Sequence, residues 1–318
     1  MAYKLKTWKL PLGARTAKGK AIVNILPIQA GVSIAAVMPV DAPEEEWEKL
    51  QIIFSTSSGD VRRNALSDFT NVRSNGKIAM DLPEDITLVN ARIANEDDDV
   101  MLVTDSGRAI RFSTTAVRVF KGRKSTGVRG IKLLGDDKVV SMSIIRHFEA
   151  SPDERSAYLK MRRAVAGMSD DAVDSPEEEE EEEINANATI TPERYAEMSA
   201  AENLILTITA SGSGKLSSSH DYPVRGRGGM GVSAIDKKMR GGLLVASFPV
   251  EIEDQIMLAT SNGQSIRVPV EGISFRSRSA GGVKVFNTGE EEQVVSVAWI
   301  AEKGEDADEN ELEAEDPT

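Results

Sequence analysis

The sequence predicts an all-β protein built as a propeller-like array, and three observations lead to this expectation. One order of sequence features recurs with a period of about fifty residues. Each copy contains alternating apolar runs separated by glycine turns, which is typical of short antiparallel strands. Apolar residues make up 40% of the 318 residues, which is enough to bury a sizeable core.

The repeats can be read directly from the chain. Four copies cover residues 52–93, 100–144, 204–248 and 256–300, and a partial copy covers residues 4–28, so we expect the chain to begin inside a repeat. Each full copy has one glycine in a turn and a second glycine about twenty residues later, and the partial copy has only the second glycine. The turn glycines are Gly59, Gly107, Gly212 and Gly263, and the second glycines are Gly19, Gly76, Gly127, Gly231 and Gly282.

Each full copy predicts four short strands, the content of one propeller blade. A β-sandwich would also supply alternating strands, but it would not explain one unit recurring in one order. We therefore predict a propeller-like β-pinwheel of about five four-stranded repeats, the first of them partial. The repeats form residues 1–145 and 204–301.

An acidic insert over residues 146–203 and an acidic tail over residues 302–318 interrupt and follow the repeats. Ser151-Pro152 and Thr191-Pro192 each combine a capping hydroxyl with proline at the first helical position, which predicts two short helices. Between them lie seven consecutive glutamates, and like charges at this density predict disorder there and in the tail.

Charge is unevenly distributed along the chain. The whole sequence carries 38 basic and 51 acidic side chains, a net charge of −13. The insert holds 16 acidic and 6 basic residues and the tail holds 9 and 1, so the repeats carry 31 basic and 26 acidic residues. The repeats are thus mildly basic, and a polyanionic partner is compatible with them.

Several classes of site are excluded by composition. There is no cysteine and there are only two histidines, which excludes disulfides, thiolate chemistry and multi-histidine metal sites. No apolar run approaches the roughly 18 residues of a membrane-spanning helix, and the first residues lack the apolar segment of a signal peptide. We expect a cytoplasmic protein with no metal and no cofactor.

Three local motifs suggest enzymatic chemistry but fit the repeat better. Gly226 to Gly231 matches G-x-G-x-x-G, yet a predicted strand follows where a dinucleotide site needs a helix. Ser211 to Lys215 resembles the end of a phosphate loop, but it lacks the first glycine and the metal-binding hydroxyl, so we expect a hairpin turn. Ser217 to Asp221 places serine, histidine and aspartate in sequence, where a loop histidine with satisfied hydrogen bonds is the better interpretation of His220.

Basic residues recur at equivalent places in the repeats, after the turn glycine and around the second glycine. In a propeller, equivalent positions lie at equal angles, so a repeated charge predicts a basic belt that contacts the phosphates of duplex DNA. Phe69, Phe120, Tyr222 and Phe275 recur once per repeat and are expected to pack between strands. The alternative is ordinary solvated surface charge. The candidate DNA-binding residues are Arg15, Lys18, Lys20, Arg62, Arg63, Arg73, Lys77, Arg111, Arg123, Lys124, Arg129, Arg225, Arg227, Arg267, Arg276 and Arg278.

The segments KTWKLPLGARTAKGKAIVNILPI and STGVRGIKL, together with the repeat, resemble the C-terminal domains of the DNA gyrase A family. The resemblance covers residues 3–145 and 204–300. It implies a β-pinwheel that wraps duplex DNA near the nucleoid, partnered by the rest of the gyrase A protein and by the gyrase B protein in an ATP-dependent topoisomerase that introduces negative supercoils. It also implies that the acidic tail modulates wrapping.

Two departures from the family pattern bear on what the resemblance implies. The catalytic tyrosine of the family belongs to a preceding domain, and Tyr3, Tyr158, Tyr195 and Tyr222 lie in unlike contexts, so we expect no catalysis by this chain. The family box Q-[RK]-R-G-G-[RK]-G is approximated at residues 225–231, with Met230 in place of a basic residue. The related topoisomerase IV protein has a more divergent ring. A propeller scaffold for protein partners is the alternative from another class, and a propeller hydrolase is a distant third.

Overall fold

The structure is a computed structural model. It describes residues 1–13, 20–28, 31–122, 125–165, 185, 188–236, 241–289 and 291–300. The predicted disorder of the poly-glutamate run and of the tail concerns residues outside these ranges.

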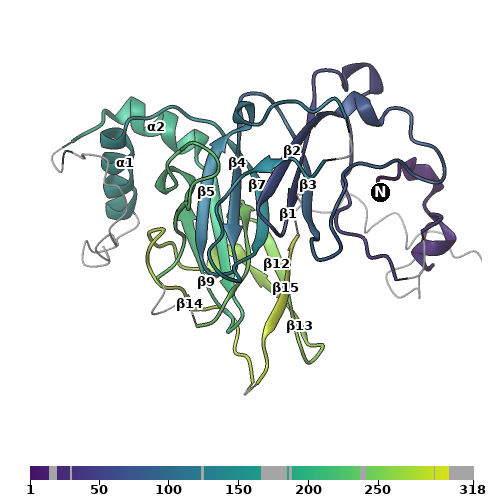
Figure 1. The fold of residues 1–318 in the computed structure, drawn as a ribbon. Helices are drawn as coiled ribbons and strands as arrows, with labels where there is room; N and C mark the ends of the chain where they lie inside the picture. Colours follow the sequence, from purple (N-terminus) through teal and green to yellow (C-terminus); the bar gives the residue numbers. More distant parts are fainter. Residues whose placement is uncertain are drawn as a thin grey trace, which may run out of the picture.

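Four antiparallel sheets follow one another along the repeats (Figure 1). The strands are β1 (Gln51–Thr56), β2 (Asp60–Ala65), β3 (Leu88–Ala94), β4 (Asp98–Thr104), β5 (Arg108–Ser113), β6 (Val128–Arg129), β7 (Val139–Arg146), β8 (Leu204–Thr209), β9 (Ser213–Ser218), β10 (Val232–Ser233), β11 (Leu244–Val250), β12 (Gln255–Thr260), β13 (Ser265–Pro269), β14 (Val283–Lys284) and β15 (Val294–Ile300). The all-β, propeller-like fold is confirmed.

The repeats exchange strands, which the sequence did not indicate. The sheet orders are β3-β1-β2-β6, β10-β5-β4-β7, β11-β8-β9-β14 and β13-β12-β15. Each of the short edge strands β6, β10 and β14 therefore comes from one repeat and completes the sheet of the preceding repeat. The bridge between Ala2 and Lys77 repeats this relation between the N-terminal residues and the first full repeat.

Each hairpin turn is closed by a threonine and a glycine. The hydroxyl oxygens of Thr56, Thr104, Thr209 and Thr260 each accept a hydrogen bond from the backbone N–H four residues later, at 3.1–3.2 Å. The glycine that follows each threonine by three residues has a φ of 76–86°, in the left-handed region that favours glycine. Local sequence therefore determines where β-strands turn in all four repeats.

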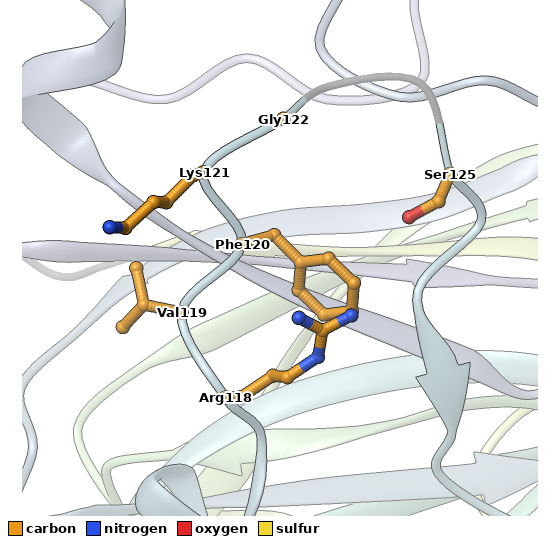
Figure 2. A pocket seen from close by; sticks show the side chains of 6 residues that line it. All are labelled: Arg118, Val119, Phe120, Lys121, Gly122 and Ser125. Atoms are coloured by element: carbon orange, nitrogen blue, oxygen red, sulfur yellow. The ribbon is translucent and has the colours of Figure 1, made fainter.

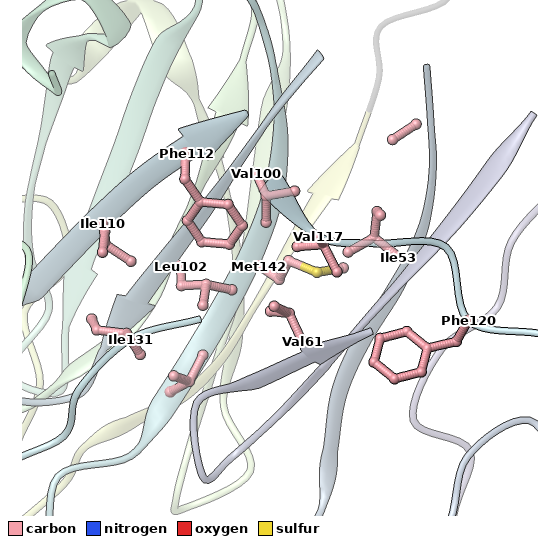
Figure 3. Packing of buried hydrophobic residues seen from close by; sticks show 12 residues of the cluster. Ile53, Val61, Val100, Leu102, Ile110, Phe112, Val117, Phe120, Ile131 and Met142 are labelled. Carbon is pink, nitrogen blue, oxygen red and sulfur yellow. The ribbon is translucent and has the colours of Figure 1, made fainter. Parts of the chain in front are cut away.

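Apolar side chains of neighbouring sheets form the core. Ile53 and Val61 of the first sheet pack against Val100, Leu102 and Met142 of the second (Figure 3). Equivalent clusters join the second sheet to the third and the third to the fourth. Because one face of a strand packs on the preceding sheet and the other face on the following sheet, the inner strands read as continuous apolar runs.

The other face of the first sheet is covered by residues 31–50. Trp47, Phe54 and Phe69 are buried there, and Lys4 forms an ion pair with Glu44 at 2.6 Å. This segment contains the 3₁₀ turn η3 (Glu44–Glu46), and residues before it contain η1 (Thr7–Lys9) and η2 (Ile22–Asn24). Further 3₁₀ turns follow β2, β5, β9 and β13: η4 (Leu66–Phe69), η5 (Thr114–Ala116), η7 (Ser219–Asp221) and η8 (Val270–Gly272).

The two helices of the insert begin where the capping residues predict. α1 (Pro152–Val165) has a reciprocal cap between Ser151 and Glu154, and in α2 (Pro192–Ala201) the Thr191 hydroxyl accepts from the N–H of Arg194 at 3.2 Å. Tyr158 of α1 is fully buried, with its ring 5.0 Å from that of His220 in η7. The helices thus pack on the third repeat.

Candidate nucleic-acid interface

Three loops project from the edges of the sheets, and we call them the rim loops: residues 119–128, 224–232 and 275–283. Each begins and ends beside one strand of the preceding repeat. Val119 lies opposite Arg63 and Val128 opposite Val61, with the corresponding pairs at β5 and β9. The two ends of each loop therefore lie beside strand residues that are two positions apart, and the described residues between these ends form a loop outside the strand pairing.

The second glycine of each repeat is required where the loop rejoins the strand. At Gly127 the φ is 106°, and an added Cβ would lie 2.1 Å from the carbonyl oxygen of Val61. At Gly231 the corresponding distance to the Ala109 oxygen is 2.2 Å. No side chain fits at such a distance, so the recurring glycine permits the close approach of two backbones.

Two candidate arginines bind the residues on either side of the preceding rim loop. Arg227 and Arg278 each lie four residues before the second glycine of their repeat. Arg227 donates from Nε to the Ala116 carbonyl and from Nη1 to the Arg129 carbonyl, both at 3.0 Å. Arg278 makes the equivalent pair of bonds, from Nε to the Asp221 carbonyl at 3.0 Å and from Nη1 to the Ser233 carbonyl. These guanidinium groups therefore tie each rim loop to the residues that flank the preceding rim loop, in addition to carrying charge.

The first rim loop forms an open concavity of about 510 Å³ (Figure 2). The guanidinium group of Arg118 lies over the Phe120 ring, 4.1 Å from its centroid, and Lys121 and Ser125 also line the hollow. Arg118 and Lys121 are exposed, and neither is among the candidates predicted from the repeated charge. Both lie near the basic pair at residues 123–124 in the sequence, and this proximity is the feature that could have identified them.

Several candidate cations are accessible to a ligand. Lys20, Arg73, Arg129, Arg227 and Arg267 are exposed. Lys77, Arg225, Arg276 and Arg278 are half-buried, and the Lys77 ammonium donates to the carbonyls of Asp68 and Asn71. Arg15, Lys18, Arg123 and Lys124 lie outside the described residues.

Three candidates are buried, and the expectation that they face a ligand was wrong. Arg62 is completely buried, Arg63 is 6% exposed and Arg111 is 4% exposed. Arg111 donates from Nε to Asp99 at 2.8 Å, from Nη1 to the Ser219 carbonyl at 2.8 Å and from Nη2 to the Arg146 carbonyl at 3.0 Å. The rim loop of the next repeat pairs with the strand at Arg63 and Arg111, and the guanidinium groups of Arg62 and Arg111 bind acceptors inside the fold, so we assign these residues to the fold.

Arg267 shows why the sequence did not reveal the burial of Arg63 and Arg111. It stands four residues after its turn glycine, as Arg111 does, but no rim loop covers β13 among the described residues, and Arg267 remains exposed. Burial at this position therefore depends on the neighbouring repeat and not on the local sequence.

The recurring aromatic residues and the glycine motif at residues 226–231 also have defined places in the fold. Phe69, Phe120 and Tyr222 are buried, as expected for packing between strands. Phe275 is half-buried: it packs against the core cluster of the third and fourth sheets, and the Arg162 guanidinium lies 4.8 Å from the centre of its ring. Strand β10 follows Gly231 directly, in agreement with the rejection of a dinucleotide site.

His220 is buried, and its Nε2 lies 2.8 Å from the carbonyl oxygen of Met198. Burial lowers the pKa of His220. The histidine is therefore a satisfied structural residue, as the sequence indicated. Among the described residues, no group of three or more histidine or acidic side chains is arranged to hold a metal ion.

Comparison with known proteins identifies the repeat. The family described as "DNA gyrase C-terminal domain, beta-propeller" matches residues 1–41, 51–95, 98–146, 203–251 and 254–298, which are the partial copy and the four full copies. The chain belongs to this family. The DNA gyrase A protein of Granulibacter bethesdensis is 44% identical over 96% of this chain and 34% of that protein, and the Rickettsia bellii protein is 39% identical over 97% and 33%.

The chain spans about a third of the length of these relatives. Among solved structures, the C-terminal domain of DNA topoisomerase IV matches with a TM-score of 0.64 at 20% identity, covering 88% of this chain and 70% of that one. The DNA gyrase A C-terminal domain matches with a TM-score of 0.62 at 18% identity, covering 91% and 78%. These two likenesses show the fold. Among the residues that the structure describes, no helix has the length and apolar character needed to cross a bilayer.

Proposed function

We propose that the chain binds duplex DNA without sequence preference through its rim loops and bends it along the row of sheets. The supporting observation is the repetition of exposed or half-buried cations on the rim loops or directly beside them, among them Arg118, Lys121, Arg129, Arg227 and Arg276. Cations at regular intervals match the phosphates of duplex DNA, which are regularly spaced whatever the base sequence. The base edges vary with the sequence and present no such regular pattern.

In the complete enzyme, this binding would serve a type II topoisomerase of the gyrase kind that introduces negative supercoils, with the remainder of the gyrase A protein and the gyrase B protein as partners. The relatives named as DNA gyrase A proteins support this assignment, and the repeat supplies a surface for a wrapped segment. The chain's own contribution is to hold DNA in a bent path, which binding by protruding cations at successive sheets would produce.

Salt dependence tests the proposal. Each phosphate neutralised contributes about −0.9 to the slope of log affinity against log salt for B-DNA. With five or more contacts, we expect a slope of about −4.5 or steeper and equal affinities for unrelated sequences. A slope near zero would contradict phosphate binding and favour the protein-scaffold alternative.

Paired variants extend this test. Arg129→Gln and Lys121→Gln each remove an exposed cation and should each reduce the magnitude of the slope by about one, with unfolding unchanged. Lys49→Gln, at an exposed position outside the rim loops, is the matched control and should leave the slope as it is.

A further inference from the structure

Lys215 is a completely buried lysine beneath the third rim loop. It lies in β9 between Gly214 and Leu216, the two residues beside which the loop begins and ends. Its ammonium donates to the carbonyl oxygens of Ser277 at 2.9 Å, Arg278 at 2.5 Å and Ala280 at 2.6 Å. Three main-chain carbonyls of the loop are therefore the direct counterparts of this charge.

Cations stand beneath the other two rim loops as well. Arg62, between the two ends of the first loop, donates from Nη1 to the Ser125 carbonyl of that loop. At the second loop, Ile110 occupies the position equivalent to Arg62 and Lys215. Arg108, two residues earlier on the same strand, donates to the carbonyls of Met230 and Gly231 at 3.2 and 2.6 Å. All three sheets with four strands therefore hold the rim loop of the next repeat by a strand cation bound to its carbonyls.

This arrangement has a consequence for an anion at the loop surface. A carbonyl oxygen that points toward solvent repels a phosphate, whereas one turned inward onto a cation does not. The buried charge is costly to desolvate, and the oxygens that surround it compensate the cost only when the loop keeps its shape. The cation and the loop conformation thus stabilise each other.

We propose that Lys215, with Arg62 and Arg108 in the other sheets, is a positioning residue that holds the rim loops in the conformation that accepts a DNA phosphate. This inference rests on the proposed DNA binding. Lys215 does not touch the DNA; it acts through the loop that carries Arg276 and Arg278.

Lys215 differs from the two arginines in its protonation. Burial lowers the pKa of Lys215 to about 7, and the other charged groups that influence it are Asp221, Arg278, Arg276 and Asp236. A neutral amine has two N–H donors for three carbonyls, so deprotonation releases one contact. Because a phosphate at the loop favours the ammonium form, DNA binding above pH 7 should be accompanied by proton uptake, and affinity should fall as pH rises.

Three variants separate this role from general stability. Lys215→Met removes all donors, Lys215→Arg keeps a cation that does not titrate, as at position 62, and Lys49→Met changes an exposed lysine outside the loops. The equilibrium dissociation constant for a duplex is measured at pH 6.5 and 8.5 at constant ionic strength, with hydrogen exchange of the amides of residues 275–283.

For the unchanged chain and Lys49→Met, we expect affinity to fall two- to tenfold between pH 6.5 and 8.5. Lys215→Arg should bind equally at both pH values, and Lys215→Met should bind weakly at both, with faster exchange confined to the loop. The inference is overturned if Lys215→Arg keeps the same pH dependence as the unchanged chain, or if folded Lys215→Met binds as the unchanged chain does at pH 6.5. A salt-independent interaction of the unchanged chain would instead contradict the proposed function itself.

Discussion

Replacing Arg111 by methionine should destabilise the fold without removing a DNA contact. The change removes the ion pair of the Asp99 carboxylate, whose side chain is fully buried, and keeps its contact with the Nδ1 of His147 at 3.0 Å. It also leaves the carbonyls of Ser219 and Arg146 without their guanidinium donors. Breaking a buried ion pair by removing one partner costs about 3–5 kcal/mol, which corresponds to a folding equilibrium weakened by roughly two to four powers of ten. Because Asp99 and Arg146 belong to one sheet and Ser219 to the next repeat, a hydrogen bond between the two repeats is lost as well.

Urea unfolding followed by far-UV circular dichroism measures this effect. Arg267→Met is the matched control, because it removes an arginine from the equivalent strand position where it is exposed, and it should change the unfolding free energy by less than about 0.5 kcal/mol. The double variant Asp99→Leu with Arg111→Met removes both buried charges and should recover much of the loss. If Arg111→Met unfolds at the same urea concentration as the control, the assignment of Arg111 to the fold is wrong.

Three further predictions concern other parts of the chain. His220 has a lowered pKa and binds a proton more weakly in the folded chain than in the unfolded one, so stability should fall as pH drops below about 6.5. When the melting temperature is measured between pH 5 and 7, its decrease toward low pH should be smaller in His220→Gln than in His147→Gln. Gly127→Ala should cost about 1–3 kcal/mol in urea unfolding because its Cβ would meet the Val61 carbonyl, while Gly272→Ala, with no atom within 4 Å of the added Cβ, should be much less costly. Deleting residues 302–318 should tighten duplex binding at low salt by removing nine competing acidic groups, and the difference should disappear above physiological ionic strength; a difference that persists at high salt would indicate a specific contact.

Local features of the fold could be predicted from sequence. Threonine and glycine at fixed spacing determine the hairpin turns, and the hydroxyls of Ser151 and Thr191 determine where the insert helices begin, because the groups that satisfy each other lie within four residues. The exchange of strands between repeats could not be predicted. Strands β6, β10 and β14 are two residues long, so they carry no alternation, and their pairing depends on a strand in the preceding repeat.

The candidate site was predictable in part for the same reason. Arg129 and Arg227 were selected from a repeated charge and are exposed, whereas Arg62 and Arg111 belong to the same charge pattern and are buried. Several acceptors of the buried guanidinium groups are main-chain carbonyls distant in sequence, such as Ser125 for Arg62 and Ser219 for Arg111. Every residue has a main-chain carbonyl, so the amino-acid sequence does not identify these acceptors. Charge periodicity therefore locates the loops but does not separate the cations that face a ligand from those that support it.

The shape imposed on DNA tests the central claim most directly. Nicked circular DNA is incubated with increasing amounts of the chain, sealed with ligase, freed of protein and resolved into topoisomers. If successive rim loops bend the duplex along one path, the mean linking number should shift in one direction in proportion to bound chain, and the variant Arg129→Gln with Arg227→Gln should reduce the shift. Binding that leaves the topoisomer distribution unchanged at saturation would contradict wrapping.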